Sequence, residues 1–139
     1  MRTIFVDASA WIAIIYEKDK NHNIASKIYR KEIVNAQLVT TNWTAYEAYT
    51  YVKTRTDIEK AILLRKTIEN KQFVKLERIT KFIEEKAIDK FWRYRDKKWG
   101  IIDITSFEIM EKISCTLAFG FDRHFVEAAK QNGFELLTP

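Results

Sequence analysis

The sequence predicts one α/β domain in which a parallel β-sheet is flanked by helices on both faces. Short β-branched and aromatic runs alternate with longer segments whose apolar residues recur at helical spacing. Strands that alternate with helices favour parallel pairing through right-handed crossovers. The chain has 139 residues, which suits one domain of common size, and its three glycines and one proline form no linker-like stretch. We therefore expect a single domain over residues 1–139.

The first half of the chain is expected to hold two strands and four helices. Thr3–Val6 and Gln37–Thr40 are short apolar runs typical of buried strands. Apolar residues at helical spacing predict the helices Ala8–Tyr16, Ile24–Val34, Asn42–Thr54 and Ile58–Ile68. The last two would form a helical hairpin between the second and third strands, from Asn42 to Asn70.

The second half repeats the alternation with shorter strands. The expected strands are Phe73–Leu76, Cys115–Ala118 and Phe134–Leu137. Thr80 is expected to begin a helix that reaches about Phe91, and Asp103 to open one that reaches about Lys112. A last short helix over Phe125–Gln131 would end at Gly133, which suits a left-handed position.

Four acidic residues lie where apolar segments stop. Asp7, Asp103 and Asp122 each follow such a run directly, and Glu47 comes early in the helix after the second strand. Because ligands bind at the carboxyl ends of the strands in an open α/β sheet, these acids could meet at one edge. Carboxylates crowded together repel one another, and a hard divalent cation with oxygen ligands relieves that repulsion.

Each acid also has a purely structural explanation. Aspartate is a favoured helix N-cap, which fits Asp7 and Asp103, and Thr44 with Glu47 fits a capping box. Asp122 follows Gly120-Phe121 in a good turn sequence. The joint arrangement of the four favours a carboxylate metal site, and a capping role is compatible with it, since a helix N-terminus holds a carboxylate rigid.

Several blocks of the sequence resemble PIN-domain nucleases, particularly VapC-type toxin ribonucleases and their stand-alone relatives. The blocks are Phe5-Val6-Asp7-Ala8-Ser9, the helix acid Glu47, Trp99-Gly100-Ile101-Ile102-Asp103-Ile104-Thr105-Ser106-Phe107 and Phe119-Gly120-Phe121-Asp122-Arg123-His124-Phe125. The resemblance spans nearly the whole chain and implies a three-layer PIN-like domain. The third and fourth blocks together are quite specific.

The resemblance implies a function and a set of site residues. Asp7, Glu47, Asp103 and Asp122 would be the catalytic acids that bind one or two Mg²⁺ or Mn²⁺ ions, and Ser9 and Ser106 would orient a carboxylate or a water. The implied activity is endoribonuclease cleavage by metal-activated water. The implied partners are RNA, an antitoxin that inserts a helix and a basic side chain into the site, and a second copy of the chain in a homodimer.

Substrate contacts are predicted in a basic and aromatic segment that runs from Phe91 to Trp99. The net charge of +5 favours a polyanionic partner. Basic side chains could hold phosphates while aromatic rings stack on unpaired bases. The alternative is a helix end whose aromatic rings pack into the core. The candidate phosphate contacts are Arg93, Arg95, Lys97, Lys98 and Arg123.

Other reactive side chains are assigned structural roles. Cys115 is the only cysteine, so the chain can form no internal disulfide, and a buried thiol is favoured over a nucleophile. His22 is expected to be exposed in a polar loop, and packing is favoured over substrate contact for His124. Aromatic residues near the acids, Trp11, Trp43 and Tyr46, are expected in the core.

No segment approaches the length of a membrane span, and the first apolar run is interrupted by Asp7, so a cytoplasmic protein without membrane contact is expected. The first hypothesis is a toxin ribonuclease of a toxin–antitoxin pair. The alternatives are a non-toxin nuclease in RNA processing and a non-catalytic RNA- or protein-binding domain of the same fold. A phosphatase with Asp7 as nucleophile is disfavoured, because Ser9 stands where such enzymes need a second aspartate.

Overall fold

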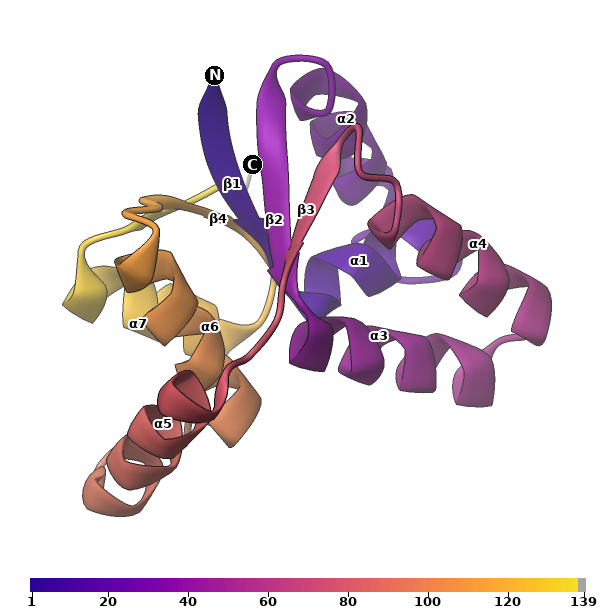
Figure 1. The fold of residues 1–139 in the computed structure, drawn as a ribbon. Coiled ribbons are helices and arrows are strands. Elements are labelled where there is room, and N and C mark those ends of the chain that lie inside the picture. Colours follow the sequence, from indigo (N-terminus) through magenta and orange to yellow (C-terminus); the bar gives the residue numbers. More distant parts are fainter. Residues whose placement is uncertain (138–139) are drawn as a thin grey trace.

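Five parallel strands form one sheet, in the order β3-β2-β1-β4-β5, in this computed structural model, which describes residues 1–137 (Figure 1). The strand order reverses at β1, which lies in the middle. In such a sheet the crevice at the carboxyl ends beside the reversal is the usual ligand site. The strands are β1 (Arg2–Val6), β2 (Ala36–Thr41), β3 (Val74–Glu77), β4 (Leu117–Phe119) and β5 (Glu135–Leu136).

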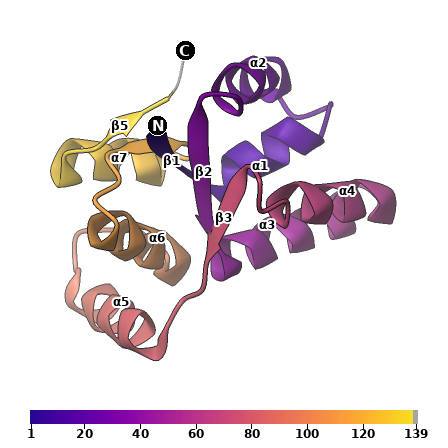
Figure 2. The same ribbon diagram turned by 45° about the horizontal axis from the view of Figure 1, so that its top comes forward.

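Helices cover both faces of the sheet, as the sequence predicts (Figures 1 and 2). One layer holds α1 (Ala8–Ile15), α2 (His22–Glu32), α3 (Asn42–Arg55) and α4 (Ile58–Ile68). The other layer holds α5 (Lys81–Arg93), α6 (Ile101–Lys112) and α7 (Arg123–Asn132). The predicted hairpin is confirmed as α3 and α4, which pack against each other.

The two layers bury alternate side chains of the strands. In β1, Ile4 and Val6 join the apolar cluster under α1–α4, whereas Phe5 joins the cluster under α5–α7. Leu38 and Val39 of β2 divide in the same way. Successive side chains of a strand point to opposite faces, so an uninterrupted apolar run is what a sheet covered on both sides requires.

Most elements start or end one or two residues away from their predicted bounds, and three of these differences concern residues that the sequence analysis singles out. Helix α6 begins at Ile101, so the pair Ile101-Ile102 is helical, and its apolar character suits either structure over so short a length. Helix α7 begins at Arg123 because Asp122 is its N-cap. Strand β4 begins at Leu117, and Cys115 precedes it, buried, with its Sγ 3.2 Å from the carbonyl of Leu117. The structural role predicted for this thiol is consistent with that position.

The long basic segment between α5 and α6 is anchored by a buried acid. Glu108 of α6 is 4% exposed and pairs with Lys86 and Lys90 of α5. The two helices are thereby fixed side by side, which holds both ends of the segment 94–100. Within residues 1–137 no helix is both long and apolar enough to cross a membrane.

Candidate active site

Asp7 ends β1 and caps the helix that follows. Its Oδ2 accepts hydrogen bonds from the backbone N–H of Ser9 at 3.3 Å and from the Ser9 hydroxyl at 2.7 Å. The same hydroxyl accepts from the backbone N–H of Phe121 at 2.9 Å, which ties β1 to the end of β4. Gly120 lies so close that a Cβ there would come within 3.0 Å of the Asp7 Cβ. Asp7 thus caps α1 as predicted, the Ser9 hydroxyl is hydrogen-bonded to its carboxylate, and Asp7 is only 5% exposed.

Glu47 reaches the same edge of the sheet from α3. The helix is capped by Thr41, whose hydroxyl accepts from the backbone N–H of Thr44 at 3.0 Å. The predicted capping box of Thr44 and Glu47 is therefore wrong, because the helix starts earlier and Glu47 lies beyond its first turn. The Glu47 carboxylate does not cap the helix, and it lines the pocket described below.

Asp103 lies within the first turn of α6 and does not follow a strand. Gly100 is the N-cap, and the Oδ2 of Asp103 accepts from the backbone N–H of Gly100 at 3.0 Å. The prediction that Asp103 follows a strand or precedes a helix is corrected to this position. A carboxylate there is stabilised by the positive end of the helix dipole.

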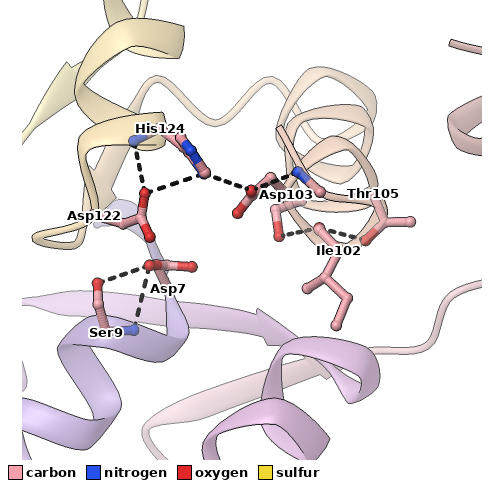
Figure 3. A network of polar contacts seen from close by, with 9 residues as sticks. Asp7, Ser9, Ile102, Asp103, Thr105, Asp122 and His124 are labelled. Atoms are coloured by element: carbon pink, nitrogen blue, oxygen red, sulfur yellow. Dashed lines mark hydrogen bonds and ion pairs between the residues drawn. The ribbon is translucent and has the colours of Figure 1, made fainter. Parts of the chain in front are cut away.

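Asp122 and His124 complete the edge (Figure 3). Asp122 caps α7 by accepting from the backbone N–H of His124 at 2.6 Å. The His124 ring nitrogen Nδ1 lies 3.2 Å from the Oδ2 of Asp103 and 3.4 Å from the Oδ1 of Asp122. His124 therefore contacts two of the acids, which the sequence analysis did not predict. It links the start of α6 to the start of α7.

All four acids line one pocket of about 420 Å³. Burial, followed by the nearby charges of Asp103 and Glu47, raises the pKa of Asp7 to about 7, although the Ser9 hydroxyl works against the rise. Burial also raises the pKa of Glu47, with Asp103 and Asp122 adding to it. The pKa of Asp103 is raised by burial and by Asp122, against its hydrogen bonds from Gly100 and His124. Burial and the neighbouring acids thus disfavour the ionisation of Asp7, Glu47 and Asp103.

The donor set fits a hard cation in its chemistry. The pocket offers four carboxylates, and a divalent cation would offset the repulsion between them and the cost of burying the ionised forms of Asp7, Glu47 and Asp103. As the side chains lie, no three His, Cys, Asp or Glu groups within residues 1–137 are close enough together to hold one ion. Coordination by three or more of these acids would require their side chains to move toward one another.

The other predicted site residues divide into two groups. Lys98 lines the acidic pocket, and Arg93, Arg95 and Arg123 are exposed outside it. Lys97 pairs with Asp96 and Glu127 and lies over the Trp99 ring. Ser106 is buried outside the pocket, where its hydroxyl contacts Thr44 and the carbonyl of Ile102.

The aromatic residues of the basic segment differ in burial. Trp99 is 4% exposed and packs edge-on against Tyr94 and Phe107, as core packing predicts. Trp92, by contrast, is 75% exposed. The aromatic residues of this segment therefore do not share one role.

One pocket residue was missed by the sequence analysis, and several aromatic residues and His22 differ in burial from what was predicted. Tyr51 lies one turn after Glu47 and lines the pocket, a spacing of four residues that the sequence could have revealed. Tyr46, expected in the core with Trp11, is 52% exposed, whereas Trp11 is fully buried as predicted. Trp43 is half-buried. His22, expected to be exposed, is half-buried with its Nδ1 2.7 Å from the carbonyl of Ala13.

The family model described as PIN domain matches residues 4–131. The chain belongs to the PIN-domain family. The resemblance stated from the sequence blocks and the predicted three-layer fold are thereby confirmed. The match includes all four acids, from Asp7 to Asp122.

Two curated relatives and one crystal structure are similar over almost the whole chain. The relatives are the 23S rRNA-specific endonucleases VapC20 of two Mycobacterium tuberculosis strains, CDC 1551 / Oshkosh and H37Rv. Each is 28% identical over 125 residues, which cover 90% of this chain and 93% of the relative. The crystal structure is that of Mycobacterium tuberculosis VapC20, described as a sarcin-ricin loop cleaving toxin. It superimposes with a TM-score of 0.88 and covers 98% of this chain and 99% of its own.

Proposed function

We propose that this chain is a divalent-metal-dependent endoribonuclease, the toxin of a toxin–antitoxin pair. The observation that carries the proposal is the pocket on a PIN fold that Asp7, Glu47, Asp103 and Asp122 line together, in which burial and neighbouring acids raise the pKa values of Asp7, Glu47 and Asp103. The likeness to VapC20 over nearly the full length of both chains supports the toxin ribonuclease class. It also makes structured ribosomal RNA the substrate to test first.

The four acids would hold one or two Mg²⁺ or Mn²⁺ ions. A bound ion would act as a Lewis acid that polarises the phosphodiester and lowers the pKa of the attacking water. Asp7 and Asp103 are held by hydrogen bonds that leave their other oxygens free toward the pocket. His124 keeps Asp103 and Asp122 near each other before an ion binds.

The remaining residues would orient the RNA and accept a proton. One or more of the acids would take the proton that the attacking water loses. Lys98 at the pocket and Arg93, Arg95, Lys97 and Arg123 around it would hold phosphates on either side of the cleaved bond. An antitoxin helix that brings a basic side chain to the acids would block the site, and a homodimer belongs to the same proposal.

RNA cleavage by wild type and Asp103→Asn tests this function. We expect wild type to cut 23S rRNA with Mg²⁺ or Mn²⁺, to stop in EDTA, and to lose activity with Asn at position 103. Growth on expressing the chain alone, against an Asp7→Asn chain, tests the toxin role. Equal growth of both strains, together with cleavage in vitro, would favour a housekeeping RNA-processing nuclease instead.

A second candidate is a non-catalytic RNA-binding domain. It is favoured by one observation: among residues 1–137, no three His, Cys, Asp or Glu side chains lie close enough together to hold one ion. Under this alternative RNA would bind equally in EDTA and in Mn²⁺, and no cleavage would appear on adding either metal.

A further inference from the structure

Three buried hydroxyl groups form a chain between the two helices that carry Glu47 and Asp103. The side chains of Thr41, Thr44 and Ser106 are each 0% exposed. The Thr41 hydroxyl donates to that of Thr44 at 3.1 Å, and the Thr44 hydroxyl lies 3.3 Å from that of Ser106. The Ser106 hydroxyl donates to the carbonyl oxygen of Ile102 at 3.0 Å.

The number of hydroxyl protons determines which hydroxyl donates in each of these hydrogen bonds. A hydroxyl has one proton to donate. The proton of Ser106 is used on Ile102 and that of Thr41 on Thr44, so the Thr44 proton is the one shared with Ser106. Thr41 also accepts from the backbone N–H of Thr44, as the N-cap of α3. Each hydroxyl is therefore satisfied, and a fully satisfied buried network has one preferred geometry.

The contact between Thr44 and Ser106 joins the opposite layers of the fold near the site. Helix α3 belongs to the layer of α1–α4, and α6 to the layer of α5–α7. Thr44 precedes Glu47 by three residues, and Ser106 follows Asp103 by three. Residues three apart lie on the same face of a helix. The two hydroxyls that touch are thus each one turn from an acid of the pocket.

We propose that Thr44 and Ser106 are positioning residues that fix the spacing between Glu47 and Asp103. The inference rests on the proposed function, because the spacing matters only if these acids share an ion. It revises the role predicted for Ser106, whose hydroxyl acts through the partner helix and touches no carboxylate among residues 1–137. Two apolar side chains could fill the same space at little cost in stability, but they would impose no particular distance between the helices.

Thr105 provides a matched control. It lies beside Ser106, is also 0% exposed, and donates to the same carbonyl of Ile102 at 2.7 Å (Figure 3). Among residues 1–137 its hydroxyl makes no hydrogen bond to α3. Thr105→Val therefore removes a buried hydroxyl from the same turn of α6 while the link between the helices remains.

The test compares Ser106→Ala, Thr44→Val, Thr44→Ser and Thr105→Val with wild type. Mn²⁺ binding is measured by calorimetry without RNA, stability by thermal unfolding, and kcat and KM by RNA cleavage. Ser106→Ala and Thr44→Val are each expected to weaken Mn²⁺ binding by about 10-fold, the size typical of groups that orient metal ligands, and to lower kcat. Thr44→Ser keeps the hydroxyl and should match wild type, as should Thr105→Val in metal affinity and kcat.

The double variant Thr44→Val/Ser106→Ala should lose no more metal affinity than the weaker-binding single variant, because the two hydroxyls act as one link. Ser106→Ala removes a single oxygen atom, so it keeps the test open if Thr44→Val fails to fold. The proposal is overturned if the variants unfold at lower temperature but keep the Mn²⁺ affinity and kcat of wild type. Wild type that neither binds Mn²⁺ nor cuts RNA would overturn the proposed function and this inference together.

Discussion

Asp7 and Asp122 occupy equivalent positions in the chain but very different surroundings. Each follows a strand, caps the next helix and accepts a hydrogen bond from the backbone N–H two residues later. Asp7 is 5% exposed beneath the other acids, whereas the Asp122 side chain is 41% exposed beside His124. The same local motif therefore yields one carboxylate whose ionisation is costly and one that water still reaches. Burial, rather than the motif, raises the pKa of Asp7.

The largest expected difference between the two acids is in catalysis. Asp7→Asn should lower kcat/KM for RNA cleavage on the order of 100- to 1,000-fold, because a buried and preorganised charge is removed. Asp122→Asn should cost about 10-fold, since a more exposed ligand is more easily replaced by water. Single-turnover cleavage with saturating Mn²⁺ measures both. Equal losses would show that burial does not rank the acids.

Asp7→Asn, which lowers activity, should raise the stability of the protein. Its folded-state pKa of about 7 lies above its ordinary value of 3.8, so the folded protein holds a proton that the unfolded chain releases. Stability from this group is complete below about pH 4 and is lost as pH rises through 7. In EDTA at pH 8, Asp7→Asn should therefore be more stable than wild type by roughly 1 to 3 kcal/mol.

The control for this gain is the same pair of proteins at pH 4, where urea unfolding should show little difference. Asp122→Asn should change stability by less than about 0.5 kcal/mol at both pH values, because asparagine is an equally good N-cap. A destabilised Asp7→Asn protein at pH 8 would mean that the Asp7 carboxylate is ionised at no cost.

Removing the hydrogen-bond partner of each acid should change the stability of the protein by a smaller amount. Ser9→Ala removes a donor to Asp7 and the acceptor for the backbone N–H of Phe121, at a cost of about 1 to 2 kcal/mol. His124→Ala removes the side-chain partner on the Asp122 side, where water can replace it, and should cost about half as much. Thermal unfolding of both variants in EDTA measures the two stability losses. A larger loss for His124→Ala than for Ser9→Ala would contradict the prediction.

The smallest effect is expected from the basic residues around the pocket. Lys98→Ala should raise KM a few-fold with little change in kcat, and should lower the slope of log affinity against log salt by about one. Arg95→Ala, outside the pocket lining, should raise KM less. RNA binding at several salt concentrations, with each variant in an Asp7→Asn background, measures the slope. An unchanged slope for Lys98→Ala would show that Lys98 does not contact the RNA backbone.

The sequence predicted the elements and the four acids because both depend on local pattern. Apolar runs such as Thr3–Val6 are distinctive in a sheet covered on both faces, and Asp57, Thr80 and Gly133 mark helix ends as expected. The position of Asp103 was misassigned because Ile101-Ile102 is too short an apolar pair to distinguish strand from helix.

What the sequence could not supply is the direction of individual side chains. Tyr46 and Tyr51 share a helix, yet only Tyr51 lines the pocket, and this depends on how α3 packs against the sheet. The contact of His124 with Asp103 joins residues 21 positions apart, and that of Ser106 with Thr44 joins residues 62 apart. Such contacts arise from tertiary packing and leave no periodic signal.

Calorimetric titration of the wild-type protein with Mn²⁺, in two buffers of different ionisation enthalpy at pH 6, tests the central claim most directly. A cation that enters the pocket must displace the proton held by Asp7, so we predict saturable binding with release of close to one proton, and loss of that release in Asp7→Asn. Binding without proton release, or equal binding by Asp7→Asn, would contradict the assignment of this pocket as the metal site.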